Sequence, residues 1–130
     1  NFGVLSVHTG APAERFEYVF TIKKQDNFVG LIGFKDTDRV NKKTEIGYWI
    51  SEKYQKQGIV TRSVDRLCHF AFSRLGINRI QIKCAAGNHA SKVIPQKLGF
   101  KFEGIEREVE LLTGNIYTDL EVYSKLKSDK

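Results

Sequence analysis

The sequence has little cysteine, which forms the disulfides of small proteins, and little proline, which is common in linkers between domains. Cys68 and Cys84 are the only cysteines in 130 residues, which excludes a disulfide framework and favours reduced thiols in the cytoplasm. Two prolines and the lack of low-complexity tracts leave no candidate linker. No apolar run approaches the ~20 residues of a membrane helix, and Asn1 to Gly10 lacks the pattern of a signal peptide. We therefore expect no membrane partner.

The composition is that of a folded domain with its own core. Residues of the AVILMFWYC set make up 41% of the chain, and aromatic residues 12%. A disordered chain would have few aromatics, and 130 residues suit one domain rather than two. We expect a single domain over residues 1–130. The chain starts with Asn1 rather than Met, which is compatible with truncation at the N-terminus.

The charge is unbalanced towards the positive. Lys and Arg number 21 against 15 Asp and Glu, so the formal net charge is +6 and the pI is near 9.4. This excess of positive charge favours an acidic partner. Charge alone does not choose between nucleic acid, an anionic membrane and a phosphate-rich small molecule.

Hydrophobic patterns divide the chain into strands and helices. Apolar residues recur every three or four positions between Gly58 and Leu75, which is typical of an amphipathic helix. Asn88 is placed to cap a second helix, which Gly99 ends. The expected strands are residues 16–24, 28–35, 44–50, 79–84, 100–107 and 117–126, and the expected helices are residues 58–75 and 88–98.

This order predicts an α/β (α+β) domain with a mixed, mostly antiparallel sheet. Residues 44–84 form a strand–helix–strand unit whose two strands are expected to be parallel, with a right-handed crossover. The outer hairpins are expected to be antiparallel. Gly47, at the centre of strand 44–50, predicts a bulge or a close backbone approach.

The most informative junction is Gln55-Lys56-Gln57-Gly58-Ile59-Val60-Thr61, where a strand leads into the long helix. The first N–H groups of a helix have no internal partner and its dipole is positive there, so a phosphate can accept several hydrogen bonds at once. Gly58 permits a close approach, and Lys56 and Arg62 add positive charge. By itself this spacing is equally typical of an ordinary turn glycine, and it is neither a P-loop nor a dinucleotide fingerprint.

Four motifs in order give a more specific signal. They are Glu45-Ile46-Gly47-Tyr48-Trp49-Ile50, Tyr54 to Thr61, Asn88-His89-Ala90-Ser91 and Lys97-Leu98-Gly99-Phe100. Together they resemble the GNAT acetyltransferase superfamily, and most closely its branch that acetylates the N-termini of ribosomal proteins. The resemblance runs from about Phe16 to Leu126.

The resemblance implies binding of acetyl-coenzyme A, with no metal. In the family, the stretch matching Gln57 to Arg62 cradles the pyrophosphate, and the strand matching residues 46–50 splays from strand 79–84 to hold the pantetheine arm. For Trp49 itself we also expect a place in the core. Val60 stands where the family usually has Gly or Ala. The residues assigned to the cofactor in this way are Tyr48, Trp49, Ile50, Gln55, Lys56, Gln57, Gly58, Ile59, Val60, Thr61, Arg62, Asn88 and Ser91.

Acetyl transfer needs a base for the amine, a donor for the oxyanion and a proton for the thiolate. The branch carries a Glu just past the penultimate strand, which corresponds to Glu110. The family's proton-donating Tyr is replaced by Pro95, which leaves Ser91 as the candidate. Pro95 also removes the hydrogen bond to the Ser91 carbonyl. The resemblance places Cys84 near the thioester, although a buried structural thiol is the preferred interpretation. Glu106, Glu108 and Glu45 compete with Glu110, and Ser91 can equally be an ordinary first-turn residue.

The acceptor is the least determined part. The family's N-terminal strand and two helices, which carry acceptor specificity, are not found in residues 1–14. The branch favours a protein N-terminus, with possible ribosomal association and a possible homodimer. A polyamine or antibiotic amine stays open. The alternative from another class is a coenzyme A-binding or ribosome- or RNA-associated module without turnover.

Overall fold

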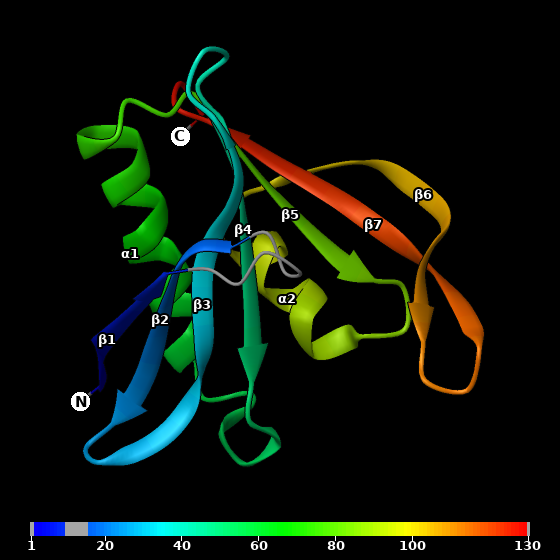
Figure 1. Cartoon of the computed structure of the whole chain (residues 1–130), viewed down its shortest axis with the longest axis horizontal. Coiled ribbons are helices and arrows are strands. Elements are labelled where there is room, and N and C mark those ends of the chain that lie inside the picture. The colour runs from blue at the N-terminus through cyan, green and yellow to red at the C-terminus, as the bar shows by residue number, and fades with distance from the viewer. Residues whose placement is uncertain (1, 10–15, 130) are drawn as a thin grey trace.

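The computed structural model describes residues 2–9 and 16–129, with side chains from Tyr18 onward. One seven-stranded sheet has the order β1-β2-β3-β4-β5-β7-β6 (Figure 1). Only the β4–β5 pair is parallel among the strand pairs described. The elements are β1 (Phe2–Thr9), β2 (Phe16–Lys24), β3 (Asn27–Asp38), β4 (Lys43–Ile50), the 3-10 turn η1 (Glu52–Tyr54), α1 (Ile59–Arg74), β5 (Arg79–Ala85), α2 (His89–Lys97), β6 (Lys101–Leu112) and β7 (Ile116–Leu126). The predicted mixed sheet with one parallel pair is confirmed.

Both helices belong to one core on one face of the sheet. The buried positions of α1 follow the predicted three- and four-residue steps, from Ile59 to Ala71. On β5, Ile80, Ile82 and Cys84 are buried and alternate with half-buried neighbours. These faces join Ile32 and other residues of β3 in one buried apolar cluster. No helix of the described chain is long and apolar enough to cross a membrane.

The first strand, β1, corrects the expectation that the N-terminal strand is missing. It pairs antiparallel with β2, and the pairing shifts register between Val4 and Ser6. In the sequence, the apolar residues change phase at that shift, from Phe2 and Val4 to Leu5 and Val7. A bulge therefore hides the two-residue alternation that marks a strand. In the described chain, α1 is the first helix.

The predicted bulge at Gly47 is wrong. Strand β4 keeps an unbroken antiparallel register with β3 from Glu45 to Ile50, with Gly47 opposite Gly33. A close backbone approach lies at Gly30, where an added Cβ would clash with the carbonyl oxygen of Trp49. A glycine is therefore needed at this position of β3.

Strand β6 runs further than predicted. The sequence pattern ends near Arg107, but the strand continues to Leu112 and forms a long hairpin with β7 that extends beyond the helices (Figure 1). Glu110 therefore lies within the strand rather than just past it. The pairing of β6 with β7 is interrupted between Glu106 and Glu110, and this irregularity broke the alternation that would have predicted the longer strand.

Candidate functional site

The sheet opens between β4 and β5. The two strands pair only at Lys43–Arg79, Thr44–Ile80 and Glu45–Gln81. Beyond that point β4 continues to Ile50 along β3, and β5 continues to Ala85 along β7, so their facing edges are unpaired. Because successive N–H groups of a strand alternate in direction, this leaves backbone donors and acceptors aimed into the gap. The predicted splay is confirmed.

A cavity of about 380 Å³ lies at one mouth of the gap, between the start of α1 and α2. The 55–61 junction supplies most of one wall. The other wall comes from α2, at positions four residues apart, which sequence reasoning missed although the spacing marks one helix face. The described lining is Ile50, Tyr54, Gln55, Lys56, Gly58, Ile59, Val60, Thr61, His89, Ala90, Val93, Ile94 and Lys97.

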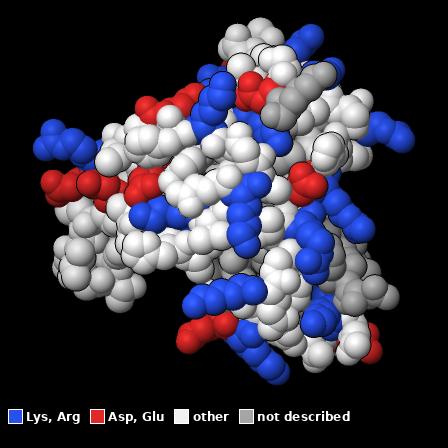
Figure 2. Space-filling model, turned by 180° about the vertical axis from the view of Figure 1, so that it is seen from behind, with Lys and Arg blue, Asp and Glu red and all other residues white. Residues whose placement is uncertain are grey.

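The start of α1 is suited to an anion. Gly58 precedes the helix with φ of 77°, and no side chain caps it, nor does an acidic residue occupy the first turn. Lys56 also has positive φ, at 67°. The Arg62 guanidinium lies beside the glycine, since a Cβ at Gly58 would be 3.0 Å from its Nη1. Uncapped N–H groups and a nearby guanidinium make this end of the helix electropositive. Basic side chains outnumber acidic ones on the helix-bearing face (Figure 2).

The residues predicted for the cofactor divide into three groups. Seven line the cavity at α1: Ile50, Gln55, Lys56, Gly58, Ile59, Val60 and Thr61. Tyr48, Asn88 and Ser91 line a second cavity at the opposite mouth of the gap. Trp49, Gln57 and Arg62 line neither. The Gln57 side chain instead bonds to Lys24 Nζ (3.5 Å) and the Lys53 carbonyl (3.4 Å).

The prediction that Trp49 fills the core is wrong. Its side chain is 55% exposed and stacks on Phe28, with ring centroids 5.9 Å apart. Its neighbours Tyr48 and Ile50 pack against the core. Strand alternation sends the odd position to the opposite face, and hydrophobicity alone does not reveal which face is covered.

Tyr48 crosses the gap and joins β4 to α2. Its hydroxyl donates to the Ser91 carbonyl at 2.8 Å and lies 3.7 Å from Cys84 Sγ. Pro95 has no N–H to offer that carbonyl, so the oxygen is left for Tyr48 and for the Cys84 thiol, at 3.5 Å. The predicted loss of the helical bond at Pro95 is therefore confirmed, and Tyr48 and Cys84 are its replacement donors.

The residues that were predicted to be catalytic lie together around the second cavity, which has a volume of about 280 Å³. Glu110, Ser91 and Cys84 line it together with Tyr48 and Asn88. Asn88 caps α2 as predicted, because its Oδ1 accepts the Ser91 N–H at 3.1 Å. The remaining lining residues are Lys35, Asp36, Glu45, Ile46, Gly47, Lys83, Ala85, Glu106, Val109 and Leu120.

The carboxylates at this cavity differ in their partners. Glu45 pairs with Lys35 at 3.4 Å, and Glu106 pairs with Lys83 at 3.1 Å. The Glu110 carboxylate makes no hydrogen bond or ion pair to any residue in the described part of the chain. Glu108 is not among the lining residues described. Glu110 therefore differs from Glu45 and Glu106, the other glutamates of this lining, in having no ion pair to a described residue.

Cys84 is a buried thiol, as preferred from the sequence. It is 3% exposed, and burial raises its pKa to about 11, so the sulfur is protonated at neutral pH. Burial likewise raises the pKa of Cys68 to about 12. A protonated thiol is a poor nucleophile, which argues against a covalent role for Cys84.

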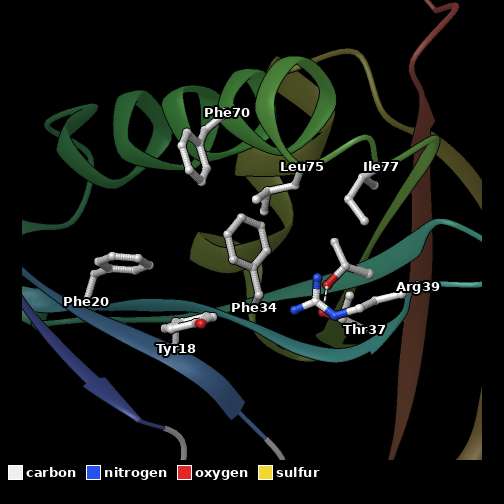
Figure 3. Close-up of a pocket in the computed structure, with 9 residues that line it drawn as sticks. Tyr18, Phe20, Phe34, Thr37, Arg39, Phe70, Leu75 and Ile77 are labelled. Atoms are coloured by element: carbon white, nitrogen blue, oxygen red, sulfur yellow. Dashed lines mark hydrogen bonds between the residues drawn. The ribbon is translucent and has the colours of Figure 1, made fainter.

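A third cavity, of about 470 Å³, lies away from this gap, between the C-terminal half of α1 and strands β2 and β3. Phe34, Phe70, Leu75 and Ile77 surround it, with Arg39 and Thr37 at one end (Figure 3). Its described lining contains no carboxylate, cysteine or histidine. We therefore place the candidate site in the gap between β4 and β5, although this third cavity is larger than either cavity of the gap.

Comparison with known proteins identifies the family of this chain. The family model of the GNAT acetyltransferase domain matches residues 6–101. The chain is 39% identical over 100 residues, 77% of its length, to a putative ribosomal N-acetyltransferase, YdaF, of Bacillus subtilis. It is 33% identical over 108 residues, 83% of its length, to the ribosomal-protein-serine acetyltransferase of Escherichia coli. The structure of RimL, a ribosomal L7/L12 α-N-protein acetyltransferase in complex with coenzyme A, superposes with a TM-score of 0.78 at 32% identity over 86% of the chain.

The chain spans 54% of the YdaF sequence, 60% of the E. coli enzyme and 63% of the RimL chain. The family match itself covers most of the 130 residues and includes the splayed strands, α1 and α2. The chain therefore belongs to the GNAT acetyltransferase family.

Proposed function

We propose that this chain forms, as a single domain, the catalytic part of an N-acetyltransferase that transfers an acetyl group from acetyl-coenzyme A to the N-terminal amine of a protein. One observation carries the proposal: an unpaired strand edge separates an electropositive helix start from a pocket with an unpartnered carboxylate. Such a gap lets a phosphate-bearing donor enter from one side and an amine from the other.

The residues at α1 fit a diphosphate. The N–H groups that follow Gly58 would hold its oxygens, and Lys56 and Arg62 would add charge. The free edge of β4 would hydrogen-bond an extended arm as a neighbouring strand does. Acetyl-coenzyme A supplies an activated acyl group as a thioester, and RimL is described in complex with coenzyme A.

Each step of the transfer has its own group at the second cavity. The Glu110 carboxylate accepts a proton from the attacking amine, since no cation in the described chain engages it. A backbone N–H on the free edge near Tyr48 or Trp49 stabilises the oxyanion. The Ser91 hydroxyl, at the start of α2, donates a hydrogen bond to the leaving thiolate, which then takes its proton from solvent. Cys84 and Tyr48 hold Ser91 in place through its carbonyl.

A protein N-terminus is the acceptor we favour because the E. coli relative acts on a ribosomal protein. A second acceptor class has its own support. Glu45, Glu106 and Glu110 line the pocket together, and such a group attracts a cationic amine. A spermidine N(1)-acetyltransferase of E. coli is 25% identical over 70% of the chain. A cytoplasmic location, ribosomal association and a homodimer stay predictions.

Two measurements test the proposal. Acetyl-coenzyme A at a hundredfold excess over its Kd should raise the free energy of unfolding by about 2.7 kcal/mol. Release of free thiol should then be followed with N-terminal peptides, spermidine and aminoglycosides. Turnover with a Ser-initiated peptide above spermidine would support the protein acceptor, and the reverse order would support a polyamine. Binding without turnover for every amine would favour a cofactor-binding module, and no binding would overturn the proposed function.

A further inference from the structure

Strand β6 contains a wide irregularity beside the proposed acceptor pocket. Glu106 pairs with Leu120 of β7, and Glu110 pairs with Thr118. Three residues of β6 thus lie opposite one residue of β7, Asp119. Two residues of β6 are therefore extra with respect to a regular antiparallel ladder.

This irregularity decides which glutamate reaches the pocket. In a regular ladder Glu108 would lie opposite Thr118, and Glu110 would lie two residues further along β6, about 7 Å away. In the structure Glu110 occupies the position opposite Thr118 and lines the pocket, whereas Glu108 does not. Since positions 106, 108 and 110 have the same parity, alternation alone cannot choose between them.

The Asp119 carboxylate closes the irregular segment. Its Oδ1 accepts the backbone N–H of Glu108 at 2.7 Å. Glu108 has φ of 44°, a left-handed conformation that is unfavourable for a residue with a side chain. A charged acceptor makes the hydrogen bond short and strong, and this bond offsets the unfavourable backbone conformation.

The main chain of Asp119 contacts the turn that follows β5, next to residues that line the same pocket. Its carbonyl accepts the N–H of Ala86 at 2.9 Å, in the turn that leads from β5 to Asn88 and Ser91. Asp119 therefore joins the strand that carries Glu110 to the turn that leads to Ser91. It does not itself line the pocket.

We propose that Asp119 is a positioning residue: by holding the Glu108 N–H it maintains the two-residue offset that puts Glu110, rather than Glu108, in the acceptor pocket. The inference rests on the proposed function, because it assigns the placement of the proposed base. It predicts that the side-chain oxygen of Asp119, and not its main-chain carbonyl, controls the rate of acetyl transfer.

The main test compares Asp119→Ala with Asp119→Asn. Asp119→Ala should lower kcat about 10- to 100-fold, because a base displaced by an ångström or more loses that much rate. Its Kd for acetyl-coenzyme A should not change. Asp119→Asn keeps an oxygen acceptor and should restore kcat to within about threefold of the unsubstituted protein. Asp129→Ala is the matched control, since Asp129 also accepts a backbone N–H, from Leu126 at 2.9 Å, but lies outside the pocket.

A second comparison separates positioning from a general loss of stability. With the offset lost, Glu108 should take the place of Glu110. Glu108→Gln should then lower the rate of the Asp119→Ala protein at least threefold, while the same substitution in the unsubstituted protein should have little effect. An Asp119→Ala kcat within twofold of the unsubstituted value, or equal damage from Asp119→Asn, would overturn the inference.

Amide hydrogen exchange provides a readout that needs no activity. The Glu108 N–H should exchange slowly in the unsubstituted protein and at least tenfold faster in Asp119→Ala. Unchanged exchange would overturn the inference even if the enzyme is active. Absence of turnover with every amine, combined with the expected change in exchange, would instead contradict the proposed function while the hydrogen bond of Asp119 is confirmed.

Discussion

The two mouths of the gap between β4 and β5 differ in the chemical groups that line them. The mouth at α1 consists largely of main chain, with a left-handed Gly58, uncapped N–H groups and two nearby cations. The opposite mouth consists of side chains, with carboxylates from β4 and β6 and hydroxyls from β4 and α2. Under the proposed function, backbone geometry would hold a large anionic donor at one mouth, and side chains that can gain or lose a proton would perform the transfer at the other.

Substitution of Glu110, the proposed proton acceptor, should have the largest effect on the rate of acetyl transfer. We expect Glu110→Gln to lower kcat about 10²- to 10⁴-fold, the usual contribution of a general base, and to leave the Kd for acetyl-coenzyme A unchanged. Thiol release and isothermal titration measure the two quantities. Glu108→Gln is the matched control, from the same strand but outside the pocket. A fall in kcat for Glu106→Gln but not for Glu110→Gln would move the base to Glu106.

Substitutions of two glycines test the role of the mouth at α1. Gly58 and Gly76 have φ of 77° and 68°, so replacement of either by Ala should lower the free energy of unfolding by about 1–2 kcal/mol. Gly58→Ala should also weaken acetyl-coenzyme A binding about tenfold, because the main chain approaches the anion there and the new Cβ displaces Arg62. Gly76→Ala, at the far end of α1, should leave binding unchanged. Equal affinities of both variants would contradict the role of the helix start.

Tyr48 joins β4 to α2 across the gap, and substitution by Phe removes its hydroxyl alone. Tyr48→Phe leaves the Ser91 carbonyl with only the weak Cys84 donor, so the free energy of unfolding should fall by about 1–2 kcal/mol. Urea unfolding measures the change. Tyr18→Phe, whose ring is 47% exposed, is the control and should be neutral. A neutral Tyr48→Phe would show that the hydroxyl does not stabilise the gap.

The smallest expected effect is a pH-dependent change in stability. It concerns the closed end of the gap, where β4 and β5 are paired. Hydrogen bonds from Arg79 and Ser124 lower the pKa of Glu103 to about 2. A lowered pKa contributes stability that is present above the ordinary pKa of 4.5 and is lost as pH falls from 4.5 towards 2. The Glu103 side chain is 39% exposed, so solvent screening limits the contribution to less than about 1 kcal/mol.

Arg79→Met should reduce this loss of stability in urea titrations between pH 5 and pH 2.5. Arg39→Met removes a similar charge from an exposed position with no hydrogen bond or ion pair in the described chain, and is the control. An identical pH dependence in both variants would contradict the role of the Arg79–Glu103 pair.

Much of the α1 mouth could be read from the sequence because it depends on a continuous stretch of chain. The helix period, Gly58 and the Asn88 cap are local features, and each lies where it was predicted. The other mouth combines five separate segments, from β3 to β7. The wrong predictions, the bulge at Gly47 and the core position of Trp49, concern which neighbour or face a strand residue meets, and local pattern does not contain that information.

The amino-acid sequence by itself therefore determined the order of the elements and the helix start that suits a phosphate, since these follow from hydrophobic period and from backbone preferences of single residues. Its four ordered motifs carried the resemblance to the family. Only the tertiary structure decided that Tyr48 bonds to the carbonyl freed by Pro95, and that Glu110 rather than Glu108 reaches the pocket. The physical reason is that pairing between strands distant in sequence sets register, and one irregularity in a ladder moves every residue beyond it.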